Sequence, residues 1–210
     1  MYKDSVRALL SPAERKIFAK LNSPQKIQDY LDTFPINFEL EVETYMSPRR
    51  AIAVKTAHCF EGALIAAAAF AYHGQKPLLL DLRTKPSDDD HAVALFKQNG
   101  RWGAISKTNH PVLRYRDPVY ASVRELAMSY FHEYFLDSGN KTLIAFSAAF
   151  DLSQYKPERW VTATEELDWL VQASDRVRHF PIAPPAAMKK LRKASKFEVK
   201  ASAVREWEPR

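Results

Sequence analysis

Apolar residues are most concentrated between Phe60 and Tyr72, a run in which Glu61 is the only charged residue. Four consecutive alanines, Ala66 to Ala69, favour helix over strand there, because alanine loses the least side-chain entropy in a helix. A helix without a polar side has to be covered on all faces. The run therefore predicts a buried helix around which the rest of the chain is arranged.

The only cysteine of the chain, Cys59, stands directly before this run, which places it in the first turn of the helix. We expect Thr56 or His58 to cap that turn, and Gly74 to end the helix. The unpaired N–H groups and the positive end of the dipole at a helix start favour a thiolate, the reactive form of cysteine. Cys59 is therefore a candidate nucleophile.

Three short apolar segments after the helix predict strands: Pro77–Leu82, His91–Phe96 and Arg101–Ser106. An acidic loop, Ser87–Asp90, separates the first two, and Asn99-Gly100 is a strong signal for a tight hairpin between the last two. These segments predict a small antiparallel sheet beside the central helix.

Helices are expected on both sides of this core. Ser-Pro pairs at positions 11, 23 and 47 each predict a helix start, and Asp117-Pro118 predicts another that continues through an apolar stripe to Phe135. A capping box at 162–165 predicts one more helix. Alternation of apolar and acidic residues over 38–43 suggests an extended segment, and the apolar residues of 142–147 suggest a further strand. The basic end of the chain after Pro185 is expected to be a frayed tail.

The order of polar groups in the core suggests nucleophilic chemistry. Cys59 lies at a helix start, His91 heads the next strand, and a polar residue follows on the antiparallel return strand. In that arrangement an imidazole accepts the thiol proton while a third group orients the ring.

The same stretch resembles the core of the transglutaminase-like family, of the bacterial type, a branch of the papain-like cysteine enzymes. The resemblance is carried by Cys59 before an alanine-rich helix, by His91-Ala92 at a strand start, and by the turn Gly100-Arg101-Trp102. It covers about a quarter of the chain. It implies an α+β, papain-like fold in which a central cysteine-bearing helix packs on a small antiparallel sheet, with extra helices at both ends.

The family has an aspartate shortly after the tryptophan, and here Ser106 takes its expected position, with Asn109 as the nearest carboxamide. Either side chain can orient a histidine by hydrogen bonding, but Ser106 supplies no negative charge to stabilise an imidazolium. The candidate catalytic residues are therefore Cys59, His91, Ser106 and Asn109. By implication of the resemblance, Tyr45, Arg49 or Arg50 faces the substrate, although each is more commonly an ordinary surface residue.

Length and composition fit one domain better than two. The chain has 210 residues, 46% of them hydrophobic, and a net charge of +6. We expect a single transglutaminase-like domain over 1–180, with its core at 45–120, and a basic C-terminal extension over 181–210. One cysteine excludes an internal disulfide, and neither a signal peptide nor a run of the ~20 apolar residues needed to cross a membrane is seen, which favours the cytoplasm.

The expected function is acyl transfer or amide hydrolysis through a thioester on Cys59, with His91 as base and a peptide or protein amide as substrate. No cofactor or metal is expected, and a metal site formed by His91 and Asp88–Asp90 is the less favoured alternative. Two other functions stay open. One is a catalytically impaired domain that binds peptides or proteins; the other, which we rank lower, is nucleic-acid binding through the basic segment 186–210. The oligomeric state is not specified by the sequence.

Overall fold

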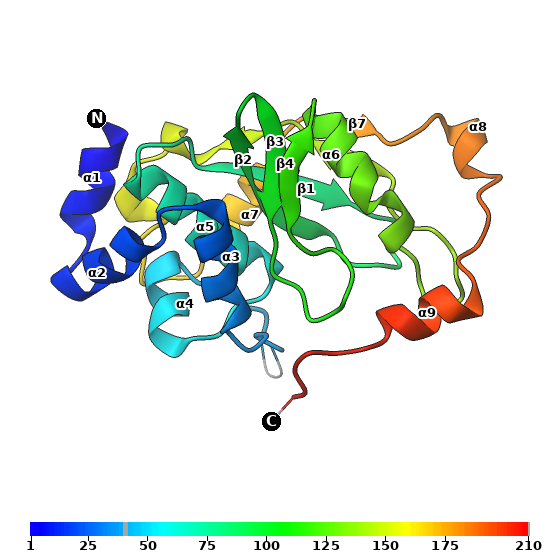
Figure 1. Ribbon diagram of the computed structural model, residues 1–210, viewed down its shortest axis with the longest axis horizontal. Coiled ribbons are helices and arrows are strands. Elements are labelled where there is room, and N and C mark those ends of the chain that lie inside the picture. Colours follow the sequence, from blue (N-terminus) through cyan, green and yellow to red (C-terminus); the bar gives the residue numbers. More distant parts are fainter. Residues whose placement is uncertain (40–41, 210) are drawn as a thin grey trace.

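The computed structural model describes residues 1–39 and 42–209 and has an α+β architecture (Figure 1). Over these ranges the α-helices are α1 (Tyr2–Leu9), α2 (Pro12–Lys20), α3 (Pro24–Asp32), α4 (Pro48–Val54), α5 (Cys59–Tyr72), α6 (Val123–Tyr130), α7 (Asp168–Asp175), α8 (Pro185–Met188) and α9 (Lys196–Ser202). The strands are β1 (Leu78–Arg83), β2 (His91–Gln98), β3 (Arg101–Ile105), β4 (Arg116–Tyr120), β5 (Ala145–Ser147), β6 (Phe150–Asp151) and β7 (His179–Pro181). Short 3-10 segments are η1 (Phe131–Glu133), η2 (Leu152–Gln154) and η3 (Pro157–Arg159).

The strands form one antiparallel sheet in the order β4-β3-β2-β1-β5-β7, and β6 also pairs with β1. Its β2–β3 hairpin turns at Asn99 and Gly100, with φ values of 50° and 77°. Positive φ at both turn residues is what the tightest hairpin connection requires. The hairpin predicted from Asn99-Gly100 is thereby confirmed.

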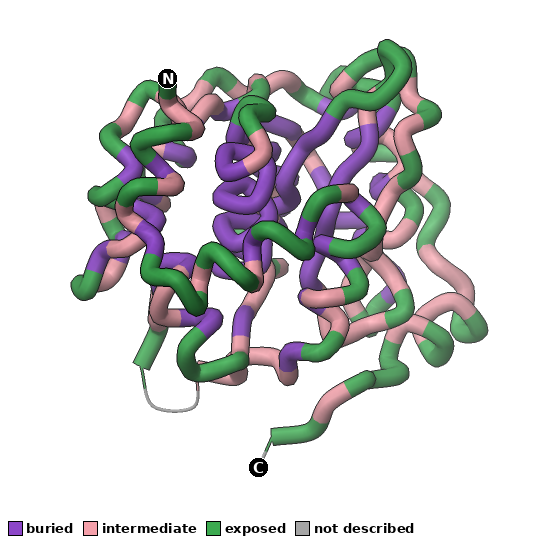
Figure 2. Tube along the Cα trace, turned by 60° about the vertical axis from the view of Figure 1, so that its left-hand side comes forward, coloured by how far each residue is buried: buried purple, intermediate pink, exposed green. Residues whose placement is uncertain are grey.

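Helix α5 is the buried centre that the sequence predicts. Every residue from Phe60 to Tyr72 is buried, and the helix ends at the left-handed Gly74, with φ 85°. It is covered by α1 to α4 on one side and packs on β2 on the other (Figures 1 and 2). The alanines let these neighbours approach closely, so α5 has no solvent-facing side.

The sheet separates two apolar clusters. Leu79, Phe96 and Ile105 point toward α5, whereas Leu80 and Leu95, among others, point toward α6 and η1. Alternation along each strand produces these two faces. The sheet is therefore held between α5 and α6, and its ends are free to carry polar groups.

Local capping signals explain the helices before the core. The side chains of Ser11, Ser23 and Ser47 each accept a hydrogen bond from the backbone N–H of the third residue of the helix that follows. A proline is the first residue of each of these helices. The three helix starts predicted from Ser-Pro pairs are confirmed. Of the extended segment expected at 38–43, positions 40 and 41 lie outside the described residues, and the others form no strand.

The helix expected from Asp117 to Phe135 is wrong in its first part. Residues 116–120 form β4, which pairs with β3, and α6 begins only after Ser122, whose side chain accepts the N–H of Glu125. Pro118 is tolerated because β4 is at the sheet edge, where a missing donor breaks no ladder. Pairing with β3 therefore prevails over the local cap-and-proline signal.

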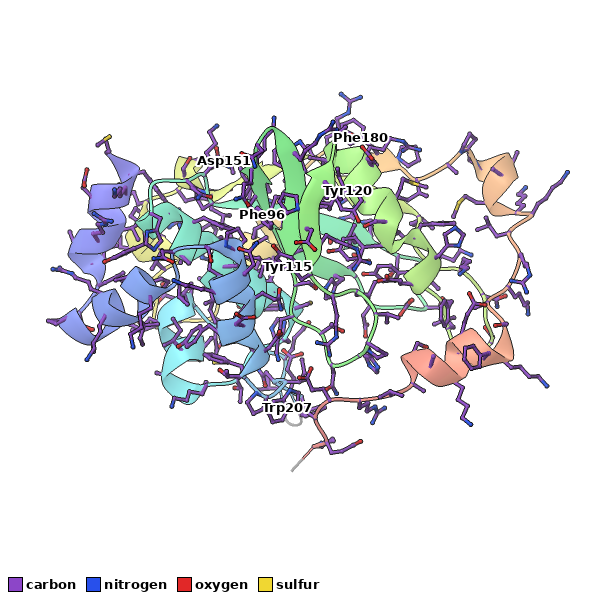
Figure 3. The ribbon with its side chains drawn as sticks, viewed as in Figure 1. Phe96, Tyr115, Tyr120, Asp151, Phe180 and Trp207 are labelled. Carbon is purple, nitrogen blue, oxygen red and sulfur yellow. The ribbon has the colours of Figure 1, made fainter. Side chains whose placement is uncertain are left out.

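Other expectations for the second half also need correction. The capping box at 162–165 starts no helix, since α7 begins at Asp168 after Leu167, and the strand expected over 142–147 is reduced to β5. The end of the chain is not a frayed tail. Beyond α9 it returns along the molecule, so that Trp207 lies near the ends of α3 and α4 (Figure 3) and lines a cavity with Pro35.

No single helix in the described ranges is long and apolar enough to span a membrane. Only α4 and α5 taken together meet that length and composition, and they are bent by 112° relative to each other.

Close packing against α5 gives a first testable prediction. A Cβ atom added at Gly62 would lie 2.6 Å from the Cβ of Lys107, a side chain that is only 1% exposed. We expect Gly62→Ala to lower the free energy of unfolding by about 1–3 kcal/mol, as overpacking does, although alanine is the better helix former. Chemical denaturation measures this change.

The exposed Ala19→Gly variant in α2 is the matched control, because it reports helix propensity alone, at about 1 kcal/mol. An unchanged or increased stability of Gly62→Ala would contradict the close contact between α5 and Lys107.

Candidate functional site

Cys59 is the first residue of α5, where the sequence places it, and it is partly accessible. It lines a cleft of about 700 Å³ together with His58, Tyr45 and residues of the acidic loop after β1. Cys59 therefore borders the cleft at the start of α5.

The start of α5 is capped by a reciprocal arrangement. His58 is the cap, and its Nδ1 accepts the N–H of Phe60 at 3.3 Å, while Glu61 accepts the N–H of His58 at 3.0 Å. The Glu61 carboxylate is fully buried and also accepts the N–H of Met46 at 3.0 Å. Of the two caps expected, Thr56 and His58, the structure has His58.

His91 and Ser106 are brought together at the end of the sheet. The His91 Nε2 lies 2.7 Å from the Ser106 Oγ, and the Ser106 hydroxyl is also hydrogen bonded to the backbone oxygen of Leu113. A carbonyl oxygen can only accept, so the serine donates to Leu113 and accepts from the Nε2–H of His91. This assignment leaves the Nδ1 of His91 as the nitrogen able to take a proton.

Two further contacts hold the serine in place. Gln28 of α3 bonds both ends of the Ser106 backbone, accepting its N–H at 3.1 Å and donating to its oxygen at 2.8 Å. Leu113 has a positive φ of 59°, and its N–H donates to Glu133 at 2.6 Å. The hydroxyl is thereby fixed between His91 and a loop that has its own support.

Asn109 does not orient His91. Its side chain donates to the backbone oxygen of Trp207 at 2.9 Å and accepts the Trp207 N–H at 2.8 Å. The carboxamide thus fastens the returning C-terminal segment, and Ser106 occupies the position beside His91.

The Cys59 thiol has two imidazoles next to it, those of His58 and His91. Burial alone raises the pKa of Cys59, but hydrogen bonding to His58 and His91, together with their charge, outweighs burial and holds that pKa well below its ordinary value. A lowered thiol pKa is the property expected of a nucleophilic cysteine.

The residues implied to face substrate divide into two groups. Tyr45 lines the cleft, whereas Arg49 pairs with Glu14 at 2.7 Å and Arg50 with Glu166 at 2.6 Å. The two arginines therefore hold α4 in place.

Arg114 and Arg116, in the loop after the hairpin and at the start of β4, also have internal partners. These partners are Glu206 for Arg114 and Glu133 for Arg116.

The cleft wall is acidic although the chain carries a net charge of +6. The carboxylates that line it outnumber its arginine and lysine side chains, which are Arg83 and Lys85. These carboxylates come from the segment before α4, from β1, from the loop after β1 and from α7: Glu39, Glu43, Asp81, Asp88, Asp89, Asp90 and Asp175. The Asp81 carboxylate lies 2.7 Å from the His179 Nε2, and burial raises the pKa of Asp81.

Sequence reasoning missed two residues of the site. His58 was considered as a cap only, although its position next to Cys59 was a signal that it also contacts the thiol. Gln28 gave no such signal, because it lies 78 positions from Ser106 and the intervening chain must fold before they meet.

Comparison of the sequence with models of protein families and with curated proteins finds no match.

The reactivity of the thiol is directly testable. At pH 6 an ordinary cysteine with a pKa of about 8.5 is only about 0.3% thiolate. Because the pKa of Cys59 is lower in the folded chain, we expect native protein to react with iodoacetamide at pH 6 at least about tenfold faster than the same chain unfolded in urea. Mass spectrometry of the adduct follows the rate.

The only cysteine of the chain makes the measurement specific, and Cys59→Ser is the control for labelling elsewhere. Equal rates in the folded and unfolded chain would show that the imidazoles do not activate the sulfur.

Proposed function

We propose that this protein is a cysteine-dependent acyltransferase or amide hydrolase of the transglutaminase-like, papain-like kind. The observation that carries the proposal is the hydrogen bond of 2.7 Å between His91 and Ser106 next to the helix-start thiol of Cys59. Cys59 and His91 also carry the resemblance in the sequence, whereas Ser106 departs from it by replacing the family's aspartate. The packing of α5 on β2 in an antiparallel sheet agrees with this kind of fold.

The proposed reaction begins with proton transfer from the Cys59 sulfur to the Nδ1 of His91. The thiolate then attacks an amide carbonyl, and the oxyanion is stabilised by the N–H of Cys59, which has no intrahelical acceptor at the first position of α5. The C–N bond breaks as the leaving amine takes the proton from His91, and a thioester remains on Cys59.

The second half returns the enzyme to its starting state. A water or an amine gives a proton to His91 and attacks the thioester carbonyl, the C–S bond breaks, and the leaving thiolate takes the proton back from His91. Water yields a carboxylic acid and an amine yields a new amide. Ser106 keeps the ring oriented throughout, by accepting from Nε2 and donating to Leu113.

A second candidate function is peptide or protein binding without turnover. It is favoured by Ser106, which orients His91 but gives the imidazolium no charged partner. In that case the cleft binds an extended segment and Cys59 only contributes to its wall.

The charge of the cleft indicates which substrates fit the proposed reaction. The carboxylates that line the cleft attract cations and repel anions, and Cys59 lines the same cleft. We propose that the preferred substrates carry lysine or arginine next to the reacting amide.

Turnover is the decisive test of the function. We expect wild-type protein to release amine from a panel of peptide amides and peptide esters, and to form hydroxamates when hydroxylamine is present as acceptor. Cys59→Ala and His91→Asn should lower kcat/KM at least about a thousandfold, since each removes a reacting group. The exposed Arg101→Ala variant on the hairpin is the control.

Rapid alkylation of Cys59 without turnover on any amide or ester would refute the enzymatic proposal and favour the binding function. Turnover that survives Cys59→Ala would refute both the nucleophile and the mechanism.

Substrate charge is tested separately. We expect peptides with flanking lysine to be better substrates than the same peptides with flanking glutamate. Asp89→Asn should reduce this preference by about twofold to fivefold, as exposed charge pairs are worth up to about 1 kcal/mol. Ratios of kcat/KM measure the preference.

The exposed Asp137→Asn, outside the cleft, is the matched control with the same change of net charge. An equal effect of the two variants would mean that net charge, and not the cleft wall, sets the preference.

A further inference from the structure

His58 is held on the cleft side of the thiol. It lines the cleft together with Cys59, whereas His91 is only 7% exposed and does not line it. The ring of His58 is fixed at both nitrogens, because Nε2 lies 2.8 Å from the backbone oxygen of Thr44 and Nδ1 accepts the N–H of Phe60. The edge of the Tyr45 ring packs against it, with centroids 5.9 Å apart.

Two carboxylates lie close to the His58 imidazole. The Nε2 of His58 is 3.6 Å from an oxygen of Glu61 and 3.7 Å from an oxygen of Glu39. The Glu61 side chain is fully buried and that of Glu39 is 28% exposed. Opposite charges at this distance, shielded from water, favour the protonated ring. His58 therefore has the charged partners that His91 lacks.

We propose that His58, supported by Glu61 and Glu39, is a second imidazole of the site, which stays protonated and stabilises the Cys59 thiolate while His91 transfers the proton. This inference rests on the proposed function. It adds a positive charge next to the nucleophile, which stabilises the thiolate. Ser106 has the separate task of orienting His91.

Hydrogen-bond geometry is compatible with both states of the ring. In the neutral ring Nε2 donates to Thr44 and Nδ1 accepts the N–H of Phe60. When the ring takes a proton from solvent, both nitrogens donate. Nε2 keeps Thr44 and the new Nδ1–H donates to the sulfur, so the N–H of Phe60 gives up its acceptor on the ring in the protonated state. No other part of the proposed reaction changes, since His58 gives up no proton during the cycle.

The surrounding charges support the protonated state. Burial lowers the pKa of His58, but the hydrogen bond to Cys59, the thiolate charge and Glu61 outweigh it and raise that pKa to about 9. Tyr134, behind the site, stays a neutral phenol, because burial and the charge of Cys59 raise its pKa well above the usual value. His91 faces the thiol from β2, and the other charged groups around the cleft are Glu43, Asp81, Arg83, Lys85, Asp88, Asp89, Asp90 and Asp175.

Asparagine at position 58 is the informative substitution. Its side-chain oxygen caps a helix as well as any residue does, so it can accept the N–H of Phe60 as His58 does, but it never carries a charge. Iodoacetamide rates are measured from pH 4 to pH 10 on the full chain for wild type, His58→Asn, His91→Asn and Glu39→Gln. Thermal unfolding of each variant reports its fold.

We expect His58→Asn to raise the midpoint of thiolate formation by at least about one pH unit and to slow alkylation at pH 6 at least about tenfold. Glu39→Gln should raise the midpoint in the same direction by a few tenths of a pH unit. Turnover by His58→Asn should be close to that of wild type near pH 9 and at least about tenfold lower at pH 6, whereas His91→Asn should abolish turnover at every pH.

A folded His58→Asn variant with the wild-type midpoint would overturn the inference. If that variant does not fold, Glu39→Gln decides the question. An unchanged midpoint of thiolate formation in Glu39→Gln would show that this carboxylate does not support the protonated ring, and would overturn the inference. Alkylation needs no substrate, so these outcomes stand whether or not turnover is found, and a failure of the proposed function is recognised separately by the absence of turnover.

Discussion

The buried carboxylate of Glu61 is the interaction on which the site depends. It lies in the first turn of α5, where it accepts the backbone N–H groups of His58 and Met46 and is also bonded by the side chains of Asn37 and Thr44. A fully buried charge is tolerated only when its hydrogen-bonding capacity is used, and removing its partners costs about 3–5 kcal/mol. Glu61 therefore forces the segment before α4 to fold over the start of α5, and this fold forms one wall of the cleft that Cys59 lines.

The third position of the site shows that orientation and charge compensation can be separated. Ser106 lies between an imidazole and a carbonyl, and such a chain of donors fixes a tautomer without adding charge. Negative charge is present elsewhere, beside His58. Orientation of His91 and negative charge are therefore provided at two different imidazoles.

Local signals in the sequence predicted the elements that carry the site. The alanine run before Gly74, the Asn99-Gly100 turn and the serine caps each specify a conformation by short-range physics, and the structure has all of them. Local signals failed at Asp117-Pro118, because the pairing of β4 with β3 is a tertiary contact that the residues near Asp117 do not indicate. Support from Gln28 and Leu113 was unpredictable for the same reason, since their partner Ser106 is positioned only by the finished fold.

Complete enclosure of α5 has a consequence for how such a protein can change. Every side chain from Phe60 to Tyr72 touches the interior, so substitutions along the helix alter stability before they alter chemistry. The segments that border Cys59, by contrast, meet solvent at Glu43, Asp89 and Asp90. Substitutions in these bordering loops can therefore change the wall of the cleft at little cost in stability, whereas substitutions along the buried helix cannot.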